Sequence, residues 1–214
     1  NDDGTVKTHQ KISALEGNFE GELDAGDAFG RAVSNISDFD GDGINDLAVG
    51  AYRDDDGGAN TGALYILFLN SDGTVKTHQK ISALEGNFAN ALQAGVCFAN
   101  AIVNLGDLDG DGVIDLAVGA HNNYAPGQKH DRTGAVYILF LNSDGMVKTS
   151  HEISNWSGNF ALDDNDSFGM SISNLGDLDG DGVTDLAVGA YGDGDGGDNM
   201  GSAYILFLNS DGTV

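Results

Sequence analysis

Four aspartates recur at the same spacing in three places along the chain, and their carboxylates could together bind a divalent cation. The three stretches read DFDGDGINDLAVGA at 38–51, DLDGDGVIDLAVGA at 107–120 and DLDGDGVTDLAVGA at 177–190. Carboxylates this close repel one another, since two unit charges about 4 Å apart cost roughly 4 kcal/mol at an effective dielectric of about 20. Ca²⁺ accepts carboxylate oxygens, whereas Zn²⁺ favours His and Cys. The pattern therefore predicts about three Ca²⁺ ions, one for each of these acidic loops.

The position of each residue in its acidic loop assigns the expected ligands. Counted from the first aspartate, carboxylates stand at positions 1, 3, 5 and 9, and position 7 offers a backbone carbonyl. A glycine at position 6 allows the sharp bend that turns this carbonyl toward the ion. The expected ligands are Asp38, Asp40, Asp42, Ile44 and Asp46 in acidic loop one, Asp107, Asp109, Asp111, Val113 and Asp115 in loop two, and Asp177, Asp179, Asp181, Val183 and Asp185 in loop three.

Position 12 distinguishes these loops from an EF-hand. An EF-hand needs a bidentate glutamate there, and this chain has Val49, Val118 and Val188. The surrounding Leu-Ala-Val-Gly-Ala run is too short and too β-like for an exiting helix. An acidic, glycine-rich turn without metal is the alternative, and the threefold recurrence argues against it.

The acidic loops belong to a larger repeat that fills the chain. Equivalent segments open at Val6, Val75 and Val147, which makes the period 69 to 72 residues. Such a period indicates a solenoid, propeller or array, in which each unit buries its apolar face against its neighbours. The chain is therefore expected to be a single repeat array over 1–214, with repeats at 6–74, 75–146 and 147–214.

Each unit shows the signals of four short strands. In the first unit they are expected at 29–36, 47–51, 63–69 and 75–81, with the acidic loop between the first two. We name them strands A, B, C and D. Strands B and C are apolar throughout, as buried strands are, whereas strand D alternates like an exposed edge. Four antiparallel strands per repeat form a β-propeller blade, so the predicted fold is all-β with three such blades.

The units resemble FG-GAP repeats, the blades of the integrin α-chain propeller. Phe29-Gly30 and Phe168-Gly169 match the FG element, and Gly50-Ala51 with its two counterparts matches GAP without its proline. The second unit departs from the FG element at Phe98-Ala99. The resemblance implies calcium ions on one face of the ring and partner-binding loops on the other.

Three blades are fewer than the roughly four to eight of known closed propellers, so a ring is expected to need a second copy or further blades. The segment 6–12 repeats the strand D pattern ahead of the first full blade. This N-terminal strand is expected to complete a last blade. It could close the third blade of its own chain, pair with another copy in a head-to-tail oligomer, or dock on a neighbour in a longer propeller.

The charge of the chain excludes several classes of partner. With 34 acidic and 9 basic residues, its formal net charge is −25. Such a protein repels nucleic acid and anionic membrane surfaces. No apolar run approaches the roughly 18 residues of a membrane span. Because weak calcium sites fill where calcium is abundant, the expected location is extracellular, either secreted or at the cell surface.

The inter-strand loops differ most between the repeats, so partner binding is expected there. The B–C loop of repeat two is the most individual, and its bases and aromatics could contact a protein or a glycan, with a loop insertion without such a role as the alternative. Aspartates in the other B–C loops, such as Asp54 and Asp193, could hold further Ca²⁺ or meet a cationic partner. The expected residues of the repeat-two loop are His121, Tyr124, Pro126, Lys129, His130 and Arg132.

The leading hypothesis is a calcium-binding extracellular structural or adhesion module that mediates protein interaction or assembly. No Ser or Cys nucleophile is visibly paired with a base, which argues against an enzyme. A carbohydrate-binding, lectin-like propeller is one alternative. The other is an accessory domain of a polysaccharide-active enzyme, since an acidic chain can supply paired carboxylates.

Overall fold

The computed structural model describes residues 4–88, 92–124, 131–157, 161–197 and 199–214, and its regular elements are all β-strands. Blade one contains β1 (Phe29–Asn35), β2 (Leu47–Ala51), β3 (Ala63–Leu69) and β4 (Val75–Ile81). Blade two contains β5 (Phe98–Gly106), β6 (Asp115–Ala120), β7 (Ala135–Leu141) and β8 (Val147–Ile153). Blade three contains β9 (Phe168–Gly176), β10 (Asp185–Ala190) and β11 (Ser202–Leu206). The strands predicted for the first repeat are confirmed to within one residue.

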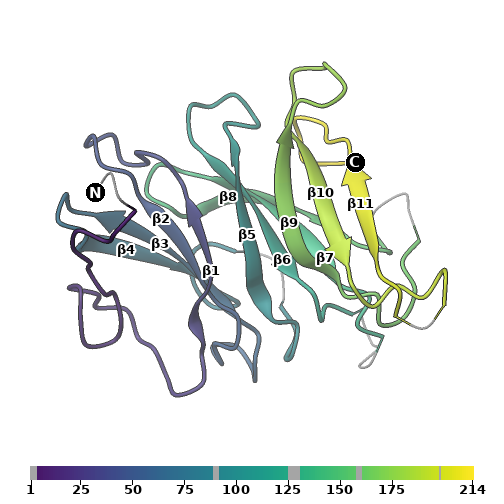
Figure 1. Cartoon of the computed structure of the whole chain (residues 1–214), viewed down its shortest axis with the longest axis horizontal. Helices are drawn as coiled ribbons and strands as arrows, with labels where there is room; N and C mark the ends of the chain where they lie inside the picture. Colours follow the sequence, from purple (N-terminus) through teal and green to yellow (C-terminus); the bar gives the residue numbers. More distant parts are fainter. Residues whose placement is uncertain (1–3, 89–91, 125–130, 158–160, 198) are drawn as a thin grey trace.

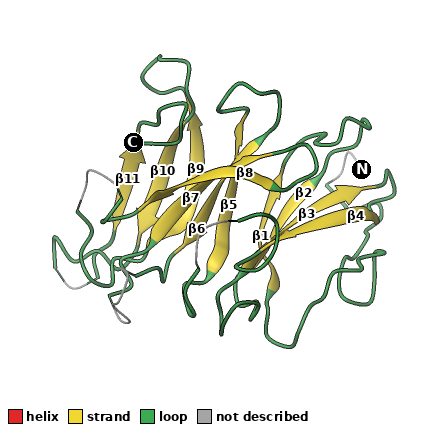
Figure 2. Ribbon diagram, turned by 180° about the vertical axis from the view of Figure 1, so that it is seen from behind, coloured by secondary structure: helices red, strands yellow, loops and turns green. Residues whose placement is uncertain are grey.

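Each blade is an antiparallel sheet whose strands follow chain order. Blades one and two have four strands each, and blade three has three described strands. Figure 1 shows the sheets side by side, with the two chain ends at opposite sides of the molecule, and Figure 2 shows the same fan from behind. In the part of the chain described, no helix is long and apolar enough to cross a membrane. The fold is thus all-β, a partial propeller whose ring is not closed.

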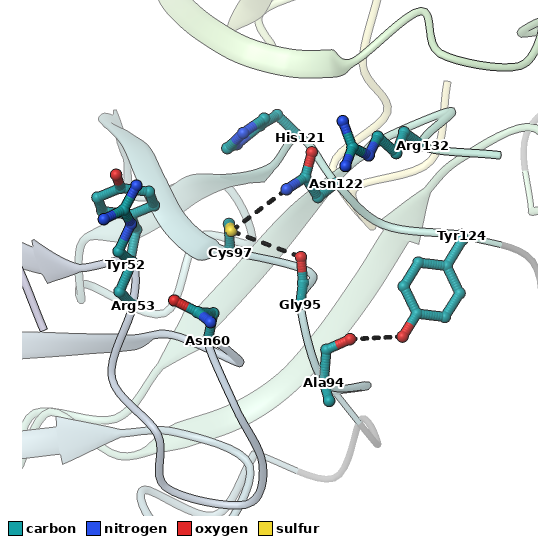
Figure 3. Close-up of a pocket in the computed structure, with 10 residues that line it drawn as sticks. All are labelled: Tyr52, Arg53, Asn60, Ala94, Gly95, Cys97, His121, Asn122, Tyr124 and Arg132. Atoms are coloured by element: carbon teal, nitrogen blue, oxygen red, sulfur yellow. Dashed lines mark hydrogen bonds between the residues drawn. The ribbon is translucent and has the colours of Figure 1, made fainter. Parts of the chain in front are cut away.

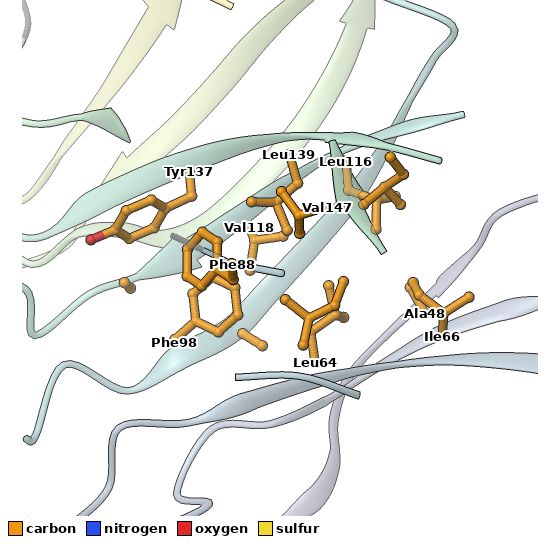
Figure 4. Packing of buried hydrophobic residues seen from close by; sticks show 14 of the residues in the cluster. Ala48, Leu64, Ile66, Phe88, Phe98, Leu116, Val118, Tyr137, Leu139 and Val147 are labelled. Atoms are coloured by element: carbon orange, nitrogen blue, oxygen red, sulfur yellow. The ribbon is translucent and has the colours of Figure 1, made fainter. Parts of the chain in front are cut away.

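Apolar strands B and C are buried in blade two because it has a neighbouring blade on each face. In blade one they are buried because blade two covers one face and the segment around Phe19 packs on the other. Between blades one and two, Leu64 and Ile66 of β3 join Phe98, Val118 and Leu139 in one cluster (Figure 4). A second cluster fills the space between blades two and three. Burial of apolar area on this scale is the main stabilising contribution to a sheet stack.

The glycine of the Gly-Ala element is required by the packing of one blade on the next. A Cβ atom on Gly50 would lie 2.0 Å from the carbonyl oxygen of Ala99, and one on Gly119 would lie 2.1 Å from that of Gly169. Both distances are far inside van der Waals contact. In blades one and two, strand B therefore lies directly against the start of strand A in the following blade.

The FG element supplies both an unusual backbone conformation and an aromatic core. Gly30 and Gly169 have φ of 86° and 83°, and Ala99 adopts the same left-handed conformation at 63°. The departure in repeat two thus leaves the backbone path unchanged, in a region that glycine adopts at less cost than alanine. The preceding phenylalanine packs on strand C, with Phe98 and Tyr137 ring centroids 5.8 Å apart.

The segment predicted as an N-terminal strand forms no strand in the structure, although it occupies a blade-like position. Its Gln10 lies against the turn at Gly73 as Gln79 of β4 lies against Gly145, since a Cβ on either glycine would be 3.2 Å from the glutamine Cβ. A strand needs a hydrogen-bonded neighbour, and no described strand C lies beside this segment. Within a single chain the segment does not join the sheet of β9, β10 and β11.

Candidate metal centres and a loop pocket

The three acidic loops lie at the same end of the blades, between the first and second strand of each. The ends of neighbouring A strands are tied together there by asparagine side chains. Asn104 Nδ2 donates to Asn35 O at 3.0 Å, and Asn174 Nδ2 donates to Asn104 O at 2.8 Å. The structure therefore places the predicted loops in equivalent positions along one edge of the fan.

In every acidic loop, three aspartates bring one carboxylate oxygen each to within 4.8 Å of one another. Ca²⁺ binds oxygen at about 2.3–2.6 Å, so oxygens on opposite sides of one ion can be about 5 Å apart. The donor set and its spacing therefore fit a calcium ion. The grouped residues are Asp38, Asp40 and Asp42 in loop one, Asp107, Asp109 and Asp115 in loop two, and Asp177, Asp179 and Asp185 in loop three.

Backbone amides shape the loop around these carboxylates. In loop two, Gly112 N donates to Asp107 Oδ2 at 2.8 Å and Val113 N donates to Asp111 Oδ1 at 2.9 Å. Loop one has the corresponding bonds from Gly43 N and Ile44 N, and loop three from Gly182 N and Val183 N. Because a bend at position 6 is needed for this wrapping, the predicted role of the glycine there is supported by its φ of about 90°.

The position-9 aspartate also ties the loop to strand C, a role that the spacing did not predict. Asp115 is almost fully buried, and its two carboxylate oxygens accept hydrogen bonds from Leu108 N at 2.9 Å and Leu141 N at 3.1 Å. Burial raises the pKa of Asp115 to about 6, although both amide donors favour the ionised form. Asp46 and Asp185 make the same pair of bonds in their blades.

A lysine from strand D bridges two carboxylates of the acidic loop in each complete blade. Lys76 Nζ lies 2.5 Å from Asp40 Oδ2 and 2.6 Å from Asp42 Oδ2. Lys148 makes the same contacts with Asp109 and Asp111, at 2.6 and 2.5 Å. The sequence indicated only that strand D is an exposed edge, because nothing in the local pattern of these lysines points to a loop more than 30 residues earlier. Among the described residues, no lysine bridges acidic loop three.

Two aspartates of the first B–C loop, which could have held a further Ca²⁺ or met a cationic partner, pair with a lysine of the same chain. Lys80 Nζ lies 2.9 Å from Asp54 Oδ2 and also pairs with Asp56. In blade two the corresponding position is Asn123, whose Nδ2 donates to Glu152 Oε1 at 3.1 Å. Blade one thus has an aspartate and a lysine where blade two has an asparagine and a glutamate, and the contact is kept. This indicates that the contact holds the B–C loop to strand D.

At the opposite end of the fan, loops from blades one and two enclose a pocket of about 780 Å³, shown in Figure 3. It lies between the two B–C loops and the segment that enters β5. The buried Cys97 lies in its wall, where its thiol accepts a hydrogen bond from Asn122 Nδ2 at 3.4 Å. We call this the interblade pocket, and it is lined by Tyr52, Arg53, Asn60, Ala94, Gly95, Cys97, His121, Asn122, Tyr124 and Arg132.

The interblade pocket contains three of the residues predicted to contact a partner, namely His121, Tyr124 and Arg132. The arginine and tyrosine that blade one contributes were not predicted, since no sequence signal places them beside the loop of repeat two. The other residues predicted in this loop, Pro126, Lys129 and His130, lie outside the described residues.

Comparison with known proteins confirms that the three units are FG-GAP repeats. A family model described as the FG-GAP repeat matches residues 29–67, 98–139 and 168–206. The chain is 33% identical to integrin alpha-4 of Xenopus laevis over 172 residues, covering 78% of this chain and 14% of the relative. It is 34% identical to integrin alpha-PS2 of Drosophila melanogaster over 172 residues (78% and 12%) and to integrin alpha-IIb of Mus musculus over 169 residues (77% and 15%). The chain thus spans only 12 to 15% of the length of these three relatives.

Proposed function

Since the chain belongs to the FG-GAP repeat family, we propose that it is a calcium-binding, extracellular propeller module that mediates adhesion or assembly and has no catalytic role. The observation that supports this most is the recurrence of a carboxylate trio in the acidic loop of each of three blades, drawn from positions 1, 3 and 5 in loop one and from positions 1, 3 and 9 in loops two and three. A chance acidic turn would not be expected to recur with the same backbone hydrogen bonds. One ion per loop would make about three Ca²⁺ in the chain.

The main effect of calcium in these loops would be to stabilise the folded blades, and any effect on partner binding would follow from that. The loop joins strands A and B, and its position-9 aspartate joins it to strand C, so an ion there holds three strands of a blade together. A ligand present at 100 times its dissociation constant stabilises the folded state by about 2.7 kcal/mol per site. Extracellular calcium sites work with dissociation constants of about 0.1–1 mM, which suits this location.

The calcium proposal is tested by isothermal titration of the full chain with CaCl₂ and by thermal unfolding in calcium and in EGTA. We expect about three bound ions and a clear fall in unfolding temperature on chelation. Replacing the position-3 aspartates, Asp40, Asp109 and Asp179, by Asn should remove both effects. Glu20→Gln, which changes an exposed acid outside the loops, should leave both intact. An unfolding temperature that EGTA does not change would contradict the proposal.

The loops at the end opposite the ions are proposed to contact a protein partner. They combine side chains from two blades, as the interblade pocket shows, and they vary between repeats on a constant scaffold. Because the ion sites and these loops occupy opposite ends of the strands, calcium would support partner binding through rigidity and not through direct contact.

Assembly is proposed because blade three exposes the face that blades one and two bury. Ile205 and Phe207 are nearly half exposed, whereas their counterparts in blade two, Ile138 and Phe140, are buried against blade three. Leu178 is exposed as well, while the corresponding Leu108 is buried. A second copy arranged head to tail would place another blade on this face. A further blade of a longer propeller would cover it in the same way.

A further inference from the structure

All three arginines of the chain gather at the interblade pocket. The guanidinium carbons of Arg31 and Arg53 lie 5.8 and 5.1 Å from the ring centroid of Tyr52, which lines the pocket. Arg132 lines the side formed by blade two, and Figure 3 shows it beside Asn122 and across the pocket from Arg53. A third of the nine basic residues of a chain with net charge −25 is therefore concentrated at one place.

Among the residues that the structure describes, these arginines have no acidic partner, in contrast to four of the lysines. Lys11, Lys76, Lys80 and Lys148 each lie within ion-pair distance of a carboxylate. Within the described part of the chain, no ion pair joins a guanidinium group to a carboxylate, and the residues that line the pocket include no acid. Since a guanidinium group offers five N–H donors and cannot lose its charge, the pocket is rich in donors and poor in acceptors.

The same positive charges act on two titratable groups in the pocket, the half-buried His121 and the buried Cys97. Burial, together with the charges of the nearby Arg31 and Arg132, lowers the pKa of His121 to about 4. Burial raises the pKa of the Cys97 thiol, while Arg53 and Arg132 act in the opposite direction. The backbone amide of His121 is fixed by Asn100 Oδ1 at 3.0 Å, yet its buried Nδ1 has no hydrogen-bond partner among the described residues. A buried polar atom without a partner is costly unless a ligand or water satisfies it.

From this geometry we infer that the interblade pocket binds the carboxylate of an aspartate or glutamate side chain presented by a protein partner. The inference deepens the proposed function, since it names the chemistry that the partner-binding loops would recognise. Planar guanidinium groups match a carboxylate in two parallel hydrogen bonds, which adds geometric specificity to the charge attraction. Arg53 and Arg132 approach from different blades, so only the packed pair of blades forms the site.

The charge around the pocket favours one isolated carboxylate over a polyanion. Asn60, which lines the pocket, donates its backbone amide to Asp55 Oδ1 at 2.7 Å, so an acid stands directly behind the rim. The chain as a whole would repel a densely acidic ligand. The segments that flank the bound carboxylate are accordingly neutral or basic.

The inference is tested by NMR titration of the isotope-labelled full chain in CaCl₂ with N-acetylglutamate methylamide. The glutamine analogue, which differs only in charge and one acceptor, serves as the matched probe. We expect saturable shifts of amides around His121 and Asn122 with the glutamate probe and little change with the glutamine probe. Arg53→Gln and Arg132→Gln should each weaken binding at least about tenfold, whereas Lys11→Gln should not.

Three results would overturn the inference: no saturable shift with the glutamate probe, equal affinity for the glutamine probe, or binding unaffected by both arginine variants. Glucuronate that binds at the pocket while the glutamate probe does not would assign the site to an acidic sugar and also overturn it. Calcium titration of Arg53→Gln and Arg132→Gln shows whether they fold, because both should still bind about three ions. If the wild-type chain binds the glutamate probe but no calcium, the calcium proposal is wrong and the inference of a carboxylate-binding pocket is retained.

Discussion

The backbone amide of Leu141 donates a 3.1 Å hydrogen bond to Oδ1 of Asp115, which joins acidic loop two to the end of β7. Leu69 and Asp46 make the same bond in blade one. The position-9 aspartate is thus both a candidate calcium ligand and part of the sheet. Its lone pairs that are not used by amides remain available to an ion, since each carboxylate oxygen can accept two bonds.

The buried carboxyl of Asp115 should give the calcium-free chain a distinctive pH dependence. Its pKa is raised to about 6 in the folded state from an ordinary value near 3.8, so the folded chain binds the proton first as the pH falls. As the pH falls from about 6 to about 4, the unfolding free energy of the wild type should therefore rise by up to about 2–3 kcal/mol relative to that of Asp115→Asn. Urea unfolding in EGTA at several pH values measures this difference.

Asp111→Asn is the matched control for that experiment. Asp111 belongs to the same loop but is exposed, and the ammonium of Lys148 lowers its pKa. Its substitution should give a difference of the opposite sign, in which wild type loses stability relative to the variant as the pH falls. If the difference in unfolding free energy between wild type and Asp115→Asn stays constant from pH 7 to pH 4, the assignment of a raised pKa to Asp115 is contradicted.

Removing the bridging lysine should strengthen calcium binding. Lys148 places a cation between Asp109 and Asp111, where it competes with Ca²⁺ for the same carboxylates. Lys148→Met should bind calcium more tightly at loop two and should unfold at a lower temperature in EGTA, because the carboxylates then repel without a counter-charge. Lys11→Met, which removes a lysine paired with Glu16 away from the acidic loops, is the control. Equal calcium titration curves for Lys148→Met and wild type would show that the lysine does not compete with calcium.

The glycines of strand B should differ in their tolerance of a methyl group. Gly119→Ala places a Cβ 2.1 Å from the backbone oxygen of Gly169, so the two blades must move apart. We expect a loss of about 3 kcal/mol or more in unfolding free energy. At Gly189 the Cβ would meet the Ser171 Oγ at 2.4 Å, and this hydroxyl can rotate away. Gly189→Ala should cost less than about 1 kcal/mol, and a similar loss in both variants would argue against the blade-contact explanation.

His121 should make the chain less stable in acid. Its pKa is lowered to about 4 when folded, compared with 6.5 ordinarily, so the unfolded chain binds the proton first. Stability from this group is complete above about pH 6.5 and falls toward pH 4, by about 1–2 kcal/mol between pH 7 and pH 5 after allowance for partial exposure. His121→Gln should remove this component. Because Asp115 acts in the opposite direction, the comparison needs both variants and cannot be read from wild type alone.

The exposed face of blade three should control assembly. We expect the purified chain to show a concentration-dependent mass above its 22.1 kDa in analytical ultracentrifugation. Ile205→Glu should shift the chain toward the monomer, because a charge cannot be buried unpaired in an apolar contact. Leu15→Glu changes a residue that is 93% exposed elsewhere and should have no effect. A wild-type monomer at high concentration would count against head-to-tail association and leave a longer propeller as the occupant of this face.

The fold was predictable from sequence because its signals are local. Strand B and strand C are short apolar runs, and the aspartates at positions 1, 3 and 5 lie within five residues of one another. The Gly-Ala element recurs in every blade, and the FG element recurs in blades one and three. The segment 6–12 has the strand D pattern but forms no strand in this single chain, since a strand pattern becomes a strand only when a neighbour completes its hydrogen bonds. That it completes a last blade stays a prediction. Local pattern could not supply that neighbour.

By itself, therefore, the sequence determined the blade repeat and the carboxylate composition of the acidic loops. Only the tertiary structure decided that Lys148 bridges Asp109 and Asp111, that Asp115 is bound by Leu141, and that Arg31, Arg53 and Arg132 meet at one pocket. These partners are separated by up to about a hundred residues, and packing between strands and blades brings them together. Charge spacing along a chain indicates which residues could bind an ion, whereas the partner of each charge depends on which strand edge and which blade lie beside it.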